Sequence, residues 1–333
     1  MKTLCRINEF VNRHMPPVVL CCVILGVAFP DSFSWLKTLS TALFAFMTFA
    51  NSLGGGFREL WNVALRPLPV LVILLILHIA MPLAALGLGT LLFPQEPLFT
   101  TGLVLEYAIP TAVASLMWAG ICRGNASMCL SVVLLDTLLS PFVVPLTLRV
   151  LVGSVVELDT LGMMRDLLLM VALPALAAMT LYQVTGGAVG HTLKPTLAPF
   201  AKAAMLLIII ANATGCAPFL RNLTPTLVLV MVAAFALCLL GFFLGYWAGR
   251  LMKLDFPSIQ TVAINSGMRN ISAGAVLASQ FFPTDVLFPV AFTPVFLQIT
   301  TAFIVKALRA TKPGRADEAA YRRSLEEAAQ EQA

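Results

Sequence analysis

Apolar stretches of membrane-spanning length follow one another along almost the whole chain, separated by short polar or Pro/Gly-containing breaks. An α-helix rises ~1.5 Å per residue, so about 20 apolar residues cross the hydrocarbon core of a bilayer. The pattern predicts an all-α polytopic membrane protein with about ten transmembrane helices. The expected spans lie near residues 16–30, 36–53, 68–93, 98–122, 126–153, 163–184, 194–214, 224–250, 256–282 and 285–308.

The composition excludes a soluble domain. Of the 333 residues, 59% are hydrophobic and only 11% are charged, whereas soluble domains carry about 25% charged residues. The lipid bilayer is therefore an expected partner. The net charge of +5 indicates no nucleic-acid partner, because the basic residues are scattered over loops and tails. The seven cysteines lie mostly in apolar segments without metal-ligand spacing, so we expect no metal site and no cofactor.

Lysine and arginine residues are unevenly distributed between the two sides of the predicted membrane region. Cytoplasmic loops are enriched in these residues, so the distribution predicts an inner-membrane protein with both termini in the cytoplasm. Residues 1–15 then form a cytoplasmic N-terminus and residues 309–333 a charged cytoplasmic tail. The cytoplasmic side carries Lys2, Arg6, Arg13, Arg58, Arg66, Arg123, Lys194, Lys202, Arg250, Lys253 and the tail cluster, against Lys37, Arg149, Arg165 and Arg221 on the other side.

The two halves of the chain resemble each other in the order of their elements. ANSLG at residues 50–54 follows the second span, and ANATG at 211–215 ends the seventh. Each motif is followed by one long apolar span and then by a span with a polar interruption. Equivalent elements recur five spans later, and an odd number of spans inverts the second copy. The order predicts two inverted five-helix repeats, residues 16–153 and 154–308, and paired interruptions of this kind indicate the binding site of a transporter.

The ninth span contains the more polar interruption, AINSGMRNIS, which begins at Ala263. An arginine at mid-membrane costs a few kcal/mol or more unless it faces protein or water. A helix break there is tolerated only against protein or a cavity. We expect Arg269, Asn265, Ser266 and Asn270 to bind substrate. The alternative is a polar contact that holds helices together.

The fourth span is interrupted at AIPTAVASL, which begins at Ala108. Pro110 lacks a backbone donor and disfavours helix at Ile109. The hydroxyls of Thr111 and Ser115 can bond the released backbone groups or a ligand. Spans 4 and 9 are thus expected to be broken helices that cross. Their half-helix N-termini would present N–H groups to an anion.

Three further ionisable residues fall within spans. Asp136 is expected either to be a counter-ion for Arg269 or to exchange a proton during transport. His78 lies deep in the third span, where a helix–helix hydrogen bond and a ligand role are both open. Glu106 is expected nearer a membrane face, lining the approach to the site. There is no HExxH, Walker A or GxSxG motif, so an enzyme is not expected.

Together, four blocks of the sequence resemble the bile acid:sodium symporter family, which includes bacterial carriers of small organic anions such as pantoate. The blocks are ANSLGGGFREL, PTAVASLMWAGICRGNASMCLSVVLLDTLLSPFVVP, INSGMRNISAGAVLASQFFP and PVAFTPVFLQITTAF. The resemblance extends over nearly all ten spans. It implies that a core domain (spans 3–5 and 8–10) moves against a panel domain (spans 1, 2, 6 and 7).

The family's sodium-binding positions carry over only in part. Of its Ser-Asn pair, Ser115 remains and Leu116 replaces the asparagine. Its acidic residue falls on Asn265 and its glutamine on Arg269. The remaining correspondences are Cys129 and Val133 at two hydroxyl positions, and Met268 and Asn270, which match the family pattern.

We hypothesise that the Arg269 guanidinium stands where a sodium ion sits in relatives. Cys129, Val133 and Asp136 share one helix face by their spacing. Asp136, His78 and Met268 are the candidate residues for ion or proton coupling. Two-sodium coupling would then give way to H⁺ coupling or to a built-in cation.

These observations predict a secondary active transporter of a small organic anion that works by alternating access. A Na⁺-coupled symporter with altered ligands is one alternative, and an uncoupled channel or facilitator is another. The substrate and the coupling ion, Na⁺ or H⁺, are not specified by the sequence. A homodimer is also compatible with it.

Overall fold

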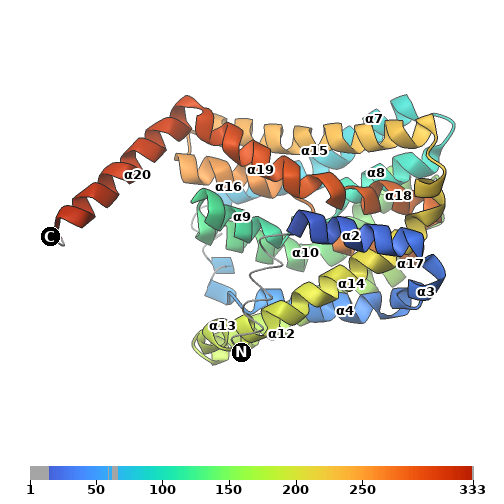
Figure 1. The fold of residues 1–333 in the computed structure, drawn as a ribbon, viewed down its shortest axis with the longest axis horizontal. Coiled ribbons are helices and arrows are strands. Elements are labelled where there is room, and N and C mark those ends of the chain that lie inside the picture. Colours follow the sequence, from blue (N-terminus) through green and yellow to red (C-terminus); the bar gives the residue numbers. More distant parts are fainter. Residues whose placement is uncertain (1–14, 59, 62–66, 332–333) are drawn as a thin grey trace.

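The computed structural model describes residues 15–58, 60–61 and 67–331. Within this part the chain is helical, with one isolated β-bridge and no strands (Figure 1). Six helical segments are long and apolar enough to cross a membrane, which confirms a polytopic all-helical protein. They are Pro67–Leu92, Ala126–Val152, Thr160–Val184, Leu193–Arg221, Pro225–Leu251 and Thr284–Ala310.

Several of these segments contain irregular turns, so each carries more than one label. The first is α6 (Pro67–Leu75), a π-helical turn η1 (Ile76–Ala80) and α7 (Met81–Leu92). The third also contains a π-helical turn, the sixth is divided at Thr293, and the other three are continuous. The remaining labels are α11 (Thr160–Leu167), η2 (Leu168–Ala172), α12 (Leu173–Val184), α18 (Thr284–Phe292), α19 (Pro294–Ala310), α10 (Ala126–Val152), α14 (Leu193–Arg221) and α15 (Pro225–Leu251).

The other four predicted spans are shorter or interrupted helices. Two are α2 (Met15–Ala28) and α4 (Leu36–Ser52). The predicted fourth span is divided into α8 (Pro97–Ala108) and α9 (Ala114–Cys122). The predicted ninth span is divided into α16 (Phe256–Gly267) and α17 (Ile271–Phe281). A helical element therefore lies at each of the predicted positions.

The local sequence explains both interruptions. Ile109 is extended (φ −63°, ψ 154°), as expected for a residue that precedes a proline. In the second interruption Met268 is extended (φ −89°, ψ 136°). The Asn270 side chain then accepts a hydrogen bond from the Ala273 backbone N–H and caps α17. Each break thus ends one half-helix and starts the next.

The helices form two groups that pack within themselves. In one, α14 packs against α2 and α4, and α12 packs against α4. In the other, α15 packs against α16, and α8 packs against α7 and α18. Figure 1 shows α4, α12 and α14 on one side of the molecule and α7, α15 and α16 on the opposite side.

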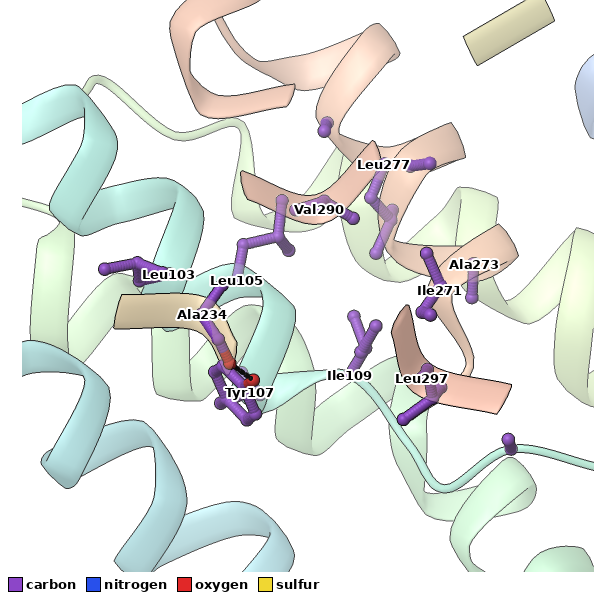
Figure 2. Packing of buried hydrophobic residues seen from close by; sticks show 14 of the residues in the cluster. Leu103, Leu105, Tyr107, Ile109, Ala234, Ile271, Ala273, Leu277, Val290 and Leu297 are labelled. Carbon is purple, nitrogen blue, oxygen red and sulfur yellow. Dashed lines mark hydrogen bonds between the residues drawn. The ribbon is translucent and has the colours of Figure 1, made fainter. Parts of the chain in front are cut away.

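Buried apolar side chains hold the end of α8 in place (Figure 2). Ile109, Ile271 and Leu297 belong to one cluster around the first interruption. The Tyr107 hydroxyl donates a hydrogen bond to the Ala234 carbonyl oxygen at 2.5 Å and so ties α8 to α15. The polar end of a buried tyrosine is thereby satisfied.

The charged tail forms a helix, α20 (Lys312–Glu331), that projects from the bundle (Figure 1). Arg123, the residue after α9, forms an ion pair with Glu318 of α20. The Arg309 guanidinium donates a hydrogen bond to the Ile121 carbonyl oxygen at 2.8 Å. The tail helix is therefore fastened to the end of α9.

A stripe of three glycines brings α15 close to α16. Gly241, Gly245 and Gly249 are spaced at four residues along α15. A methyl group on Gly245 would lie 2.7 Å from the Val262 carbonyl oxygen and 2.8 Å from the Ala263 Cα. Close approach of helices through small residues is typical of membrane proteins. Because these contact atoms belong to the backbone, they cannot move aside as a flexible side chain would.

We expect Gly245→Ala to lower the free energy of unfolding by about 1–3 kcal/mol, because the added methyl group overpacks a rigid contact. Thermal unfolding of the detergent-solubilised protein measures this change. The matched control is Gly87→Ala on α7, where a methyl group would meet no atom within 4 Å. Equal melting temperatures for the two variants would contradict the proposed close contact.

Candidate functional site at the helix crossover

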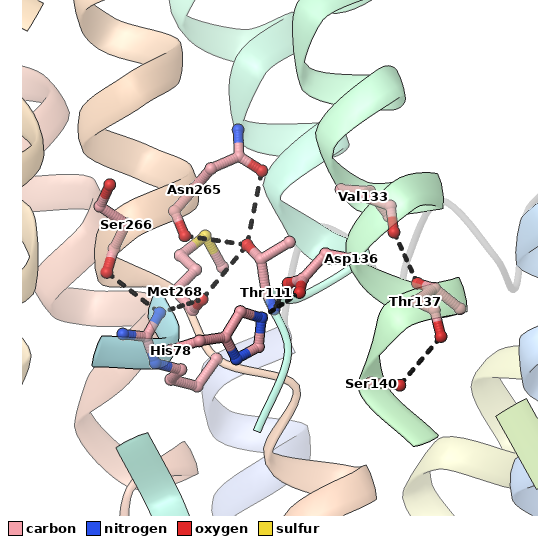
Figure 3. Close-up of polar contacts among 10 residues, drawn as sticks. His78, Thr111, Val133, Asp136, Thr137, Ser140, Asn265, Ser266 and Met268 are labelled. Atoms are coloured by element: carbon pink, nitrogen blue, oxygen red, sulfur yellow. Dashed lines mark hydrogen bonds and ion pairs between the residues drawn. The ribbon is translucent and has the colours of Figure 1, made fainter. Parts of the chain in front are cut away.

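The two interruptions meet backbone to backbone. Thr111 and Arg269 form an isolated antiparallel β-bridge. The Asn270 backbone N–H donates a hydrogen bond to the Pro110 carbonyl oxygen at 2.8 Å. The Thr111 hydroxyl donates to the Asn265 carbonyl oxygen at 2.9 Å (Figure 3). These bonds satisfy backbone groups that the broken helices release, as an apolar environment requires.

Asp136 of α10 holds the first interruption from the other side. One carboxylate oxygen accepts a hydrogen bond from the Thr111 backbone N–H at 2.6 Å. The other lies 2.5 Å from the His78 Nε2 atom (Figure 3). His78 is in the π-helical turn η1, a type of irregularity that often occurs at functional sites.

These contacts show which groups Asp136 and His78 bind directly. Both Asp136 oxygens are used by Thr111 and His78, and the described residues show no ion pair between Asp136 and Arg269. Asp136 thus forms no direct ion pair with Arg269, although it is close enough for the two charges to interact. His78 makes the helix–helix contact, from η1 to α10. Its Nδ1 atom has no partner among the described residues.

Arg269 is 2% exposed and is the largest of the fully buried side chains described. Its Nη1 atom donates to the Ser266 carbonyl oxygen at 3.1 Å and approaches the Met268 carbonyl oxygen at 3.5 Å. The guanidinium carbon lies 5.7 Å from the centre of the Tyr107 ring, in cation–π range. Its Nε and Nη2 atoms have no hydrogen-bond partner within the described part of the chain.

Glu106 lies in a different place from the one expected. The sequence suggested that it lines an approach near a membrane face, but it is fully buried. Neither carboxylate oxygen has a hydrogen-bond partner among the described residues. The nearby Thr293 hydroxyl donates instead to the Pro289 carbonyl oxygen at 3.1 Å. Glu106 is at the last turn of α8, close enough to Arg269 for their charges to interact.

Asn265 is the centre of a neutral hydrogen-bond cluster. Its amide nitrogen donates to the Thr261 carbonyl oxygen at 3.0 Å and to the Cys129 sulfur at 3.3 Å. A carbonyl oxygen can only accept, which fixes the orientation of the amide. The amide oxygen then accepts from the Ser115 hydroxyl at 3.2 Å. The cluster joins α16, α9 and α10.

A cavity of about 1240 Å³ lies beside the crossover. Residues of α2, α4 and α14 form one wall, and residues of α9, α17, α18 and α19 form the other. The first turns of α9 and α17 both line it, through Ala114 and Ile271. The lining includes the basic residues Arg269, Lys202 and Lys306 and, among the described residues, no aspartate or glutamate.

Only two of the residues expected to bind substrate line this cavity, Arg269 and Asn270. The others are buried in the helix packing behind it: Thr111, Ser115, Asn265 and Ser266. A methyl group on Gly245 would lie 2.7 Å from the Ser266 Cβ, so Ser266 packs against α15. The candidate coupling residues His78, Asp136 and Met268 are also buried and lie outside the lining.

Sequence reasoning missed several polar residues of the cavity wall: Asn51, Trp118, Lys202, Asn212, Gln298 and Lys306. Trp118 and Gln298 bridge α9 and α19 through a hydrogen bond of 2.9 Å. Lys202, Met205, Ile209 and Asn212 recur at three- or four-residue intervals along α14, which is the spacing of one helix face. That periodicity was a usable signal.

Comparison with known proteins identifies the family. A model of the sodium bile acid symporter family matches residues 41–223, more than half of the chain. Uncharacterized protein YbaS of Bacillus subtilis (strain 168) is 38% identical over 86% of this chain and 94% of its own length. The chain belongs to the sodium bile acid symporter family.

More distant relatives of the family carry descriptive names. Uncharacterized sodium-dependent transporter YocS of Bacillus subtilis (strain 168) is 24% identical over 85% of this chain and 86% of its own length. Probable sodium/metabolite cotransporter BASS1, chloroplastic, of Arabidopsis thaliana is 28% identical over 83% of this chain and 68% of its own length. As a symporter-family member, the protein is a multi-pass membrane transporter of a small molecule.

The sodium bile acid symporter resemblance makes a sodium site the obvious group to test against these residues. Na⁺ is held by oxygen ligands such as the carbonyls of unwound helices. Here an Arg269 N–H group points at the Ser266 and Met268 carbonyl oxygens. At the other positions, Leu116, Cys129 and Val133 supply no side-chain oxygen, and the Asn265 amide nitrogen faces Cys129. These positions therefore supply fewer oxygen ligands for Na⁺ than the family pattern does.

We expect Asp136→Ala to destabilise the protein by about 3 kcal/mol, because it leaves His78 and the Thr111 N–H without their buried partner. In the Asp136→Ala background, the further change His78→Ala should cost less than in the native protein, with a coupling energy of about 0.5–3 kcal/mol. Thermal unfolding of the four proteins in the cycle gives this energy. Asp31→Ala, at an exposed residue of α3 (Pro30–Phe33), is the control. Additive effects would rule out a functional unit of His78 and Asp136.

Proposed function

We propose that this protein is a secondary active transporter that moves a small organic anion by alternating access. The observation that carries the proposal is the charge of the cavity. Its lining contains Arg269, Lys202 and Lys306 and no carboxylate among the described residues. A cavity with this charge balance favours an anion over a cation or a neutral solute.

The substrate carboxylate would bind at the first turns of α9 and α17. Each has the positive end of a helix dipole and N–H groups without intrahelical partners. Both turns line the same cavity, together with Asn270. Paired half-helix N-termini of this kind bind anionic groups in transporters built from inverted repeats. Arg269, which lines the same cavity, would raise the positive potential at this point.

The proposed movement separates a panel of α2, α4, α12 and α14 from a core that contains the crossover. The cavity between the two groups supports this division. We also propose inverted repeats at residues 16–153 and 154–308, which two further observations support. Asn51 of ANSLG and Asn212 of ANATG, which the repeat pairs with each other, both line the cavity. The interruptions of the two repeats pair with each other in antiparallel fashion.

For coupling, we propose that Arg269 acts as a fixed cation and that H⁺ is the coupling ion. The Arg269 contacts with the Ser266 and Met268 carbonyl oxygens support this proposal. Asp136 and His78 are placed to gain or lose a proton, and Asp136 is bonded to the backbone of the interruption at Thr111. A change of charge there would act directly on the first turn of the half-helix. Glu106 and Arg269 are the nearby charged groups of the crossover.

Na⁺-coupled symport with altered ligands is the alternative. It is favoured by the family to which the chain belongs and by the names of two relatives. We place the protein in a bacterial inner membrane with both termini in the cytoplasm, because its basic residues are concentrated on that side. The proposed function is compatible with a homodimer and does not require one.

We expect uptake of radiolabelled pantoate, or of another small monocarboxylate in a panel, into proteoliposomes that contain the protein. An inward proton gradient should stimulate uptake, and a Na⁺ gradient of equal size should not, because Arg269 occupies the sodium position. Counterflow with unlabelled substrate should accelerate uptake, which a pore does not show. Strong dependence on Na⁺ would contradict the fixed-cation role and support the alternative.

Arg269→Gln should reduce uptake of the same anion about tenfold or more, since it removes a positive charge close to the binding point. The measurement is initial uptake by equal amounts of folded protein, checked by gel filtration. Arg165→Gln is the matched control, because the Arg165 side chain is 75% exposed and lies on α11. Near-normal uptake by Arg269→Gln would exclude Arg269 from the site.

A further inference from the structure

The basic residues of the cavity lie at two levels. Arg269 is at the crossover, where α9 and α17 begin. Lys202 lies nine residues after the start of α14, and Lys306 lies four residues before the end of α19. Both lysines line the same cavity. Lys202 belongs to the group of α2, α4 and α14, and Lys306 to the opposite wall.

The distance between the two levels follows from helix geometry. Leu297 lies at the level of the crossover, in one cluster with Ile109 and Ile271 (Figure 2). Nine residues of helix separate Leu297 from Lys306 along α19, which is ~14 Å at 1.5 Å per residue. The backbone at Lys306 is therefore ~14 Å from the level of the first turns of α9 and α17. A lysine side chain that reaches back toward the crossover shortens the distance that a ligand must span by about its own length.

The wall between the two levels is mainly apolar. It includes Met117 and Ile121 of α9, Met205 and Ile209 of α14, and Phe303 of α19. Its polar residues Trp118 and Gln298 form a hydrogen bond with each other. The cavity thus has positively charged residues at each of two levels and a mainly apolar middle. Its volume of about 1240 Å³ exceeds the ~300–1000 Å³ of ordinary ligand pockets. A small monocarboxylate would use only the crossover level.

We infer that the cavity contains a second anion subsite formed by Lys202 and Lys306, and that it binds a dianion with an apolar spacer more tightly than a monocarboxylate of the same length. This inference rests on the proposed function. One carboxylate binds at the first turns of α9 and α17, and the second binds between the two lysines. The second carboxylate contacts both walls of the cavity, because Lys202 and Lys306 lie on opposite walls. It is therefore bound in the conformation of this structure.

The test compares acids of equal length that carry one or two carboxylates: suberate with octanoate, and adipate with hexanoate. Affinity is measured from the rise in melting temperature of the detergent-solubilised protein with ligand concentration. The native protein should bind suberate more tightly than octanoate. Lys202→Ala and Lys306→Ala should each reduce this preference by up to about fivefold, the range for solvent-exposed charge pairs.

The matched control is Lys312→Ala, an exposed lysine at the start of α20 that lies outside the cavity lining. It should keep the native preference for suberate. Lys202→Arg and Lys306→Arg retain the charge and should also keep most of it, which separates loss of charge from damage to the fold. The preference should be larger for suberate over octanoate than for adipate over hexanoate, because the shorter chain does not reach both levels.

The outcomes separate the two proposals. Equal affinity for suberate and octanoate, unaffected by either lysine variant, would overturn the second subsite and leave the anion transporter intact. Binding of none of the four acids, with no uptake of any monocarboxylate, would overturn the transporter proposal itself. A preference for suberate that survives in the Lys202→Ala/Lys306→Ala double variant would also overturn the assignment to these lysines.

Discussion

The structure depends on one constraint, which is that backbone groups released inside a membrane must find partners in the protein itself. Two helices break at the same depth, and each supplies part of what the other lacks. The Pro110 carbonyl accepts from the Asn270 N–H, and the Thr111 hydroxyl reaches the Asn265 carbonyl. Asp136 completes the set by accepting from the Thr111 N–H. Neither interruption would be tolerated without the other.

Once the crossover is fixed, the surrounding residues follow from it. A carboxylate this deep requires its own partner, and His78 reaches it from an irregular turn that carries one extra residue. The half-helices that begin at the crossover direct their positive ends toward one cavity. Arg269 adds a full charge behind them. The architecture thus concentrates positive potential at a point that is accessible from the cavity.

The sequence predicted the helices and both interruptions, because hydropathy determines membrane spans and Pro110 breaks a helix through its covalent structure. It did not predict which faces of the helices meet. A helix that is apolar all round, such as α8 or α15, shows no stripe that distinguishes packing from lipid. Glu106 was therefore expected to line the approach to the site, although it is buried. The partners of Asp136 come from residues distant in sequence, which spacing alone does not reveal.

The attachment of the tail helix has a practical consequence. Because Arg123 pairs with Glu318, and Arg309 bonds to the end of α9, α20 is mechanically continuous with the crossover helices and not with α14. α20 also packs against α16 and α19. A spectroscopic label on α20 would thus report the position of the crossover helices. With a second label on α4, the distance between the two labels would measure the separation of the two cavity walls.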